Sequence, residues 1–185
     1  VPPYPGQHDP FIAALYFLKS AKLNMGAEFF GQALFALALA GTVAAVWKFR
    51  RYGVFLLLWL PLPFYALSIA YGSVPIYLPV WYPFSYYNVR YGLELLPVFA
   101  VFIAVLTDFA LERMNRAPVR IAVAVIVIGL VVGSYVSIYS QTPITLREAQ
   151  ANSAGRTVME RALANSLKQL PASATLLMYG ADYPG

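Results

Sequence analysis

Long apolar runs with few or no acidic or basic residues alternate with short polar or basic segments along this chain. The first run, Phe29 to Trp47, has roughly 19 residues, about the length that an α-helix needs to cross 30 Å of hydrocarbon. Further apolar runs extend from Val54 to Tyr71, from Leu93 to Ala110 and from Ile121 to about Tyr139. The pattern predicts an all-α polytopic membrane protein with about four transmembrane helices within residues 27–140.

The second of these runs contains two prolines, Pro61 and Pro63. A proline inside a helix removes one backbone donor and leaves a carbonyl to find another partner. We therefore expect a kink in this span near the middle of the bilayer.

The flanking segments have shorter or more mixed patterns. Residues 1–26 combine a proline-rich loop with a helical pattern from Phe11 to Met25, which is short for a span and predicts a helix at the membrane interface. Residues 141–185 contain a helical pattern from Leu146 to Leu170 and then the apolar run TLLMYG, which is typical of a buried strand. They predict the beginning of a small external α/β domain, cut short at Gly185. Because the chain also opens without a methionine, we interpret it as a fragment.

Basic residues mark the turns between spans. The run KFRR follows the first span, and Arg113, Arg116 and Arg120 lie between the third and fourth spans. The positive-inside rule places both turns in the cytoplasm, so residues 1–27, 72–90 and 140–185 lie outside. The expected location is the inner (plasma) membrane, crossed several times, with both ends of this chain on the periplasmic or external side.

The overall composition supports this class of protein. The chain is 60% hydrophobic and 11% charged, whereas soluble domains average about 45–50% apolar and about 25% charged residues. Its net charge of +5 is spread over single residues and short flanking clusters, which argues against nucleic-acid binding. The absence of cysteine excludes disulfides and thiolate metal sites or nucleophiles. Membrane lipids are the expected surroundings.

The segment between the second and third spans is unusually aromatic. Pro75, Pro79 and Pro83 recur at every fourth position and predict a rigid, non-helical outer loop. Aromatic rings at this face stack on sugar rings, line a path for a polyprenyl chain, or form an ordinary interfacial belt. The candidate substrate-binding aromatics are Trp81, Tyr82, Tyr86, Tyr87 and Tyr91.

Two charged residues open the third span. Arg90 can bind a phosphate through two parallel hydrogen bonds, whereas the alternative is an i, i+4 ion pair with Glu94. Glu94 is a candidate proton acceptor or cation ligand, but its simplest role is to neutralise Arg90. At the other end of the same span, Asp108 is expected to pair with Arg113 or to lie among lipid headgroups.

The segment NVRYGLELLP, from Asn88 to Pro97, resembles the C-terminal membrane half of bacterial GT-C glycosyltransferases, a group that includes protein O-mannosyltransferases and aminoarabinose transferases. In many of them an arginine–tyrosine pair opens a late span before a Leu-Leu-Pro run, as Arg90 and Tyr91 do here. The resemblance implies transfer of a sugar from a polyprenyl-phosphate donor to an acceptor on the outer face. It implies no certain cofactor, although the family's catalytic carboxylate activates the acceptor or positions a divalent metal. That carboxylate lies in a first external loop that has no counterpart here, so the catalytic residues stay unknown.

Two other classes of function fit the pattern. Kinked spans with an intramembrane Arg/Glu pair also occur in transporters or flippase subunits, although no ionisable residue lies near mid-membrane and no inverted repeat is present. The second of these classes is a non-enzymatic membrane assembly protein whose external domain binds a partner. The sequence contains no phosphate-binding glycine loop, nucleophile elbow or zinc motif.

Overall fold

The computed structural model describes residues 3–169 and residue 171, and its regular elements are all helices, with no strand among the described residues. The described part contains four helical stretches long and apolar enough to cross a membrane, which confirms the predicted four-span membrane protein. The elements, in order, are α1 (Pro10–Met25), α2 (Glu28–Trp47), α3 (Phe49–Tyr52), the 3₁₀ helix η1 (Gly53–Trp59), α4 (Pro61–Tyr71), the 3₁₀ helix η2 (Val89–Leu95), α5 (Leu96–Glu112), α6 (Ala117–Gln141) and α7 (Ile144–Leu167).

The second span is broken where the sequence predicted a kink. Its first half is the 3₁₀ helix η1, and α4 begins at Pro61, in the first helical position, where a missing N–H costs nothing. The indole Nε1–H of Trp59 donates to Thr42 Oγ1 on α2 at 3.2 Å. This hydrogen bond ties the end of the irregular half to the first span.

The core of the bundle lies where α2 and α5 pack against each other. Phe99 and Phe102 of α5 are almost fully buried, and the ring of Trp59 stacks on Phe102 with centroids 5.9 Å apart. A methyl group at Gly41 of α2 would collide with the backbone of Phe102. The missing side chain thus permits the close helix approach that stabilises packing in membranes.

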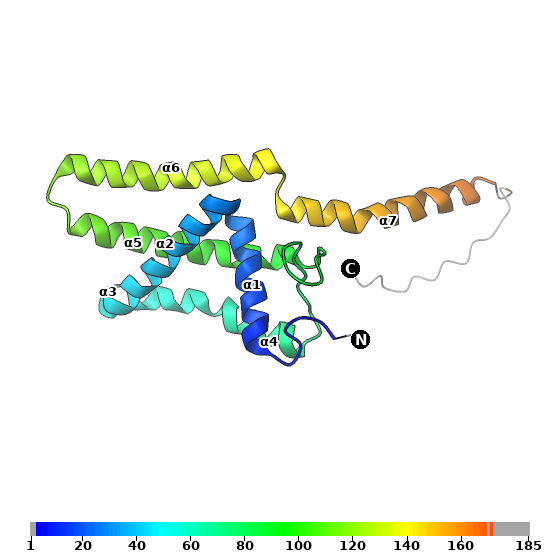
Figure 1. Cartoon of the computed structure of the whole chain (residues 1–185), viewed down its shortest axis with the longest axis horizontal. Helices are drawn as coiled ribbons and strands as arrows, with labels where there is room; N and C mark the ends of the chain where they lie inside the picture. The colour runs from blue at the N-terminus through cyan, green and yellow to red at the C-terminus, as the bar shows by residue number, and fades with distance from the viewer. Residues whose placement is uncertain (1–2, 170, 172–185) are drawn as a thin grey trace.

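Helix α1 runs across the long axes of α5 and α6 rather than along them (Figure 1). One of its faces packs on η2, α4 and α2. The Ser20 hydroxyl donates to the Val89 carbonyl at 2.7 Å, and both residues are fully buried. The buried residues on this face are Ala13, Phe17, Ser20, Ala21 and Met25. The predicted short helix is therefore confirmed, and it supports the start of the third span.

Helix α6 lies beside α5 but is almost unburied, since Ser134 is its one buried residue. At Thr142, where φ is 65°, the chain turns into α7, which extends beyond the end of α5 (Figure 1). The helix predicted after the last span is present as α7, whereas the predicted strand of the external α/β segment lies outside the described residues.

The two basic turns lie at the same end of the bundle, and the aromatic loop with α7 lies at the opposite end (Figure 1). One membrane-spanning stretch separates each basic turn from the aromatic loop, and one separates the second basic turn from α7. The basic turns and the aromatic end therefore lie on opposite sides. Which end faces the cytoplasm stays a prediction from the positive-inside rule.

Candidate functional site

The aromatic loop, residues 72–88, contains no helix, as the sequence predicted, and its two ends are joined. Tyr77 and Tyr87 form an isolated antiparallel bridge with N–H···O distances of 3.0 and 3.3 Å, and their rings lie 5.7 Å apart. Asn88, buried and in the left-handed region, donates its side-chain amide to the Pro75 carbonyl at 2.9 Å. These contacts fix the path of the chain into η2.

The middle of the loop is attached to α1 through one tyrosine. The Tyr16 hydroxyl donates to the Tyr82 carbonyl at 2.8 Å, and its ring meets Trp81 edge-on at 5.0 Å. Lys19 Nζ lies 5.5 Å above the Trp81 ring. Burial raises the pKa of Tyr16 and, together with the nearby charge of Lys22, lowers the pKa of Lys19. Trp81 is thus half-buried on α1, while the Tyr82 ring projects from the surface.

Arg90 lies on η2 with an exposed side chain and forms no ion pair with any described residue. Its guanidinium lies 5.7 Å from the centroid of Tyr91, and the half-buried Tyr91 packs beside Tyr65 of α4 at 5.4 Å. The expected ion pair with Glu94 is therefore wrong. The segment is a 3₁₀ helix, in which residues three apart eclipse, so residues four apart lie about 120° away from each other.

The carboxylate that contacts this segment comes from α7. Glu148 is only 4% exposed, and its Oε2 accepts a hydrogen bond from the Arg90 backbone N–H at 3.2 Å. The first N–H groups of a helix lack partners within it, and the Asn88 side chain does not satisfy them because it bonds to Pro75. Glu148 therefore caps η2 across 58 residues of sequence. No local sequence signal indicated this contact.

The remaining predicted aromatic, Tyr86, faces a different part of the structure. It lines a cavity of about 150 Å³ at the junction of α6 and α7, together with Gln141 and Arg147. The predicted residues therefore occupy four places. Arg90, Tyr91 and Glu94 lie on η2, and Trp81 and Tyr82 lie beside α1. Tyr87 belongs to the bridge with Tyr77, and Tyr86 lies at the α6–α7 junction. They do not form one closed pocket in the described chain.

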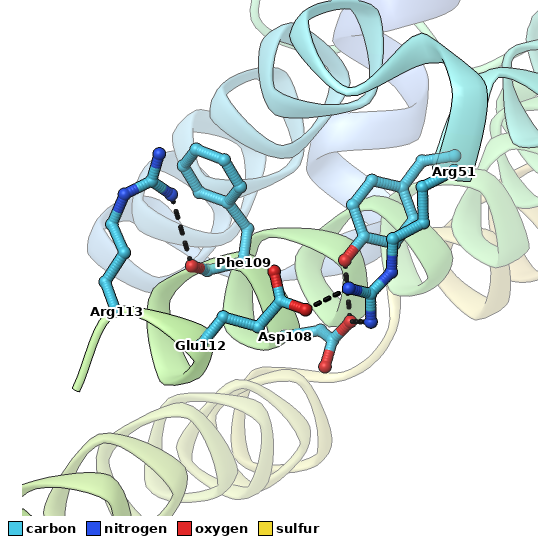
Figure 2. Close-up of polar contacts among 6 residues, drawn as sticks. Arg51, Asp108, Phe109, Glu112 and Arg113 are labelled. Atoms are coloured by element: carbon cyan, nitrogen blue, oxygen red, sulfur yellow. Dashed lines mark hydrogen bonds and ion pairs between the residues drawn. The ribbon is translucent and has the colours of Figure 1, made fainter. Parts of the chain in front are cut away.

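A second polar cluster lies at the basic end of the bundle (Figure 2). Arg51 forms ion pairs with Asp108, at 2.9 Å, and with Glu112. The Tyr52 hydroxyl donates to the same Asp108 oxygen at 2.7 Å. The sequence-based pairing of Asp108 with Arg113 is wrong, because Arg113 turns to the Phe109 carbonyl, 3.3 Å away. The cluster joins α3 to the end of α5, and its carboxylates are occupied by hydrogen-bond donors.

Within the described residues no group of three or more His, Cys, Asp or Glu side chains is arranged to hold a metal ion. No family model, curated protein or solved structure matches this chain. The case for a function therefore depends on the geometry at the aromatic end and on the short resemblance around Arg90.

Proposed function

We propose that this chain forms the donor-binding wall of an integral membrane glycosyltransferase of the GT-C type. The donor is a sugar linked to polyprenyl phosphate, and transfer takes place at the outer face of the membrane. In this proposal Arg90 binds the phosphate that leaves with the lipid. The enzyme's location in the inner (plasma) membrane and the outward orientation of the aromatic end are parts of the same proposal.

The observation that carries the proposal is the exposed guanidinium of Arg90 at the start of a span, which forms no ion pair within residues 3–169. An arginine at a membrane interface that forms no ion pair keeps its full charge and its five N–H donors for a ligand. Arg90 lies where the aromatic loop meets the third membrane-spanning stretch, a position that in this proposal falls at the level of the lipid phosphates. A phosphate monoester or diester is the ligand that suits this group best.

The hydrogen bonds around Arg90 hold its backbone and involve none of its side-chain N–H groups. Glu148 accepts the backbone N–H, and the Ser20 hydroxyl holds the carbonyl of the preceding Val89. Tyr91 supports the guanidinium from one side. A positioned cation of this kind stabilises negative charge as it develops on a departing phosphate, so Arg90 acts on the leaving group and not as a base. The exposed rings of Tyr82 and Tyr87 offer surfaces on which a sugar can stack.

Binding of a short polyprenyl phosphate tests the proposal. The purified full chain in phosphatidylcholine nanodiscs is titrated with farnesyl phosphate and with farnesol, its uncharged counterpart. Hydrogen bonds between charged partners contribute about 1.5–3 kcal/mol, so Arg90→Ala should weaken farnesyl phosphate binding by roughly ten- to a hundredfold. Farnesol binding should not change, and Arg90→Lys should keep part of the affinity.

Arg116→Ala is the matched control, because it removes an exposed arginine from the opposite end of the bundle. If Arg90→Ala binds farnesyl phosphate as tightly as the unmodified chain, Arg90 has no role in the donor site. Equal losses from Arg90→Ala and Arg116→Ala would indicate unspecific attraction to a basic protein and would also contradict the proposal.

A further inference from the structure

A row of cavities, called the groove below, follows the gap between α5 and α6 from the aromatic end of the bundle toward its basic end. Three cavities lie along it and share lining residues. The cavity at the α6–α7 junction shares Ile138 with a cavity of about 110 Å³ beside α1. The latter shares Ala100, Ile103 and Val131 with a cavity of about 490 Å³ between the two helices.

The walls of this groove are regular helical stripes. On α6 the lining positions recur at spacings of three and four residues, as one face of a helix does. They are Ala124, Val127, Ile128, Val131, Ser134, Tyr135 and Ile138. On α5 the floor is formed by Ala100 and Ala104, one turn apart and both exposed. Small side chains at these two positions leave the space that larger residues would fill.

The chemistry of the lining changes along the groove. The cavity of about 490 Å³ between α5 and α6 is almost wholly apolar, whereas the mouth at the α6–α7 junction contains Gln141, Thr142 and Arg147. Arg147 lines the mouth, donates to the Gln141 carbonyl and forms no ion pair with any described carboxylate, so it can offer further N–H donors to a ligand there. At the far end the wall includes the carboxylate of Asp108.

We propose that this groove is a binding site for one acyl chain of an anionic phospholipid, with the lipid phosphate at Arg147. The groove lies within membrane-spanning helices, so the molecules that reach it carry hydrocarbon chains. The Arg147 cation at the mouth orients an anionic amphiphile with its head there, since the Asp108 carboxylate at the other end is already paired with Arg51. From Ala124 to Ile138 the wall is about 21 Å long at 1.5 Å per residue, compared with about 15 Å for one leaflet. That length holds an acyl chain, while a long isoprenoid chain would extend past it.

This site is separate from the one proposed for the sugar donor. Arg90 lies over Tyr91, which packs on α4, whereas Arg147 lines the junction of α6 and α7 with Tyr86. The two proposals can therefore fail independently.

Native mass spectrometry of the full chain tests the lipid site. The protein is released from detergent after incubation with palmitoyl-oleoyl-phosphatidylglycerol or with the corresponding phosphatidylcholine. The unmodified chain should retain phosphatidylglycerol preferentially, and Arg147→Ala should reduce this preference by about five- to tenfold, as expected for one interfacial cation. Arg147→Lys keeps the charge and should keep much of the preference.

Ala104→Phe fills the groove without disturbing the buried core, because Ala104 is exposed. It should lower retention of both lipids. The controls are Arg161→Ala, an exposed arginine further along α7, and Ala122→Phe, an exposed alanine on α6 that is not among the lining residues of the three cavities. Neither control should change retention, and Arg90→Ala should not change it either.

Three results would overturn the proposal. Equal losses from Arg147→Ala and Arg161→Ala would show that general charge attracts the lipid. A lipid-free dimer that Ala104→Phe dissociates would show that a second copy of the chain covers the groove. Displacement of phosphatidylglycerol by farnesyl phosphate, in a manner that depends on Arg147, would assign the groove to the sugar donor.

Discussion

The contact between Glu148 and the Arg90 backbone makes the start of the third span depend on a helix that follows the fourth. We expect Glu148→Ala to loosen η2 without unfolding the bundle. The change removes the acceptor of an N–H group that has no other partner in the described structure. Because Glu148 is 4% exposed, the lost acceptor is also poorly replaced by water.

The size of the effect follows from the geometry of this one bond. At 3.2 Å it is at the long limit for N–H···O hydrogen bonds, so we assign it about 1–2 kcal/mol, the lower part of the range for charged acceptors. A loss of this size raises the population of locally open η2 by about five- to thirtyfold.

Hydrogen–deuterium exchange measured by mass spectrometry should detect this opening in peptides covering residues 86–95. In Glu148→Ala their exchange should accelerate by that factor, while α2 and α5 peptides stay protected. Glu148→Gln keeps an oxygen acceptor and should show a smaller change. Glu160→Ala is the control, because it removes an exposed carboxylate from the same helix, one that pairs with Arg156 of α7 itself. Unchanged exchange in Glu148→Ala, or an equal acceleration in Glu160→Ala, would refute the capping role.

Two further predictions concern the packing of η2 and the cluster at the basic end. Gly92→Ala would bring a methyl group to about 2.6 Å from the Ser20 hydroxyl oxygen, and overpacking of this kind should cost about 1–3 kcal/mol. Thermal unfolding in detergent should show this loss of stability. The control Gly129→Ala, whose methyl group would have nothing within 4 Å, should leave the melting temperature unchanged or slightly raised. Equal changes of melting temperature in the two variants would contradict the close packing of η2 on α1. Arg51→Ala should lower the melting temperature slightly at low ionic strength and hardly at high salt, because its ion pairs are about half exposed. A large decrease of the melting temperature that does not depend on salt would contradict this weak, solvent-screened contribution of the Arg51 ion pairs.

The spans could be predicted from the sequence because their signal is local. An uncharged run of sufficient length identifies a span whatever its neighbours are, and Pro61 marks the start of α4 because its ring fits the first helical turn. The same holds for α1, whose apolar spacing is contained in the segment itself.

The polar contacts could not be predicted, because their partners lie far apart in sequence. Arg51 meets Asp108 across 57 residues, and Arg90 meets Glu148 across 58. The Arg90–Glu94 pair was expected from a spacing rule that holds for an α-helix, and the 3₁₀ geometry of η2 removes the basis of that rule. Sequence reasoning therefore located the candidate arginine but assigned it the wrong neighbour.

Helix α7 connects the two proposed sites through consecutive residues. Arg147 and Glu148 point about 100° apart on the helix, the first to the mouth of the lipid groove and the second to the cap of η2. A displacement of α7 would move both contacts together, whereas substitution of either side chain changes one site alone. A lipid phosphate at Arg147 would favour the docked position of α7 and thereby the capped form of η2, on which Arg90 is presented. The lipid around this protein would then influence how well the donor phosphate is bound, although neither ligand touches the other.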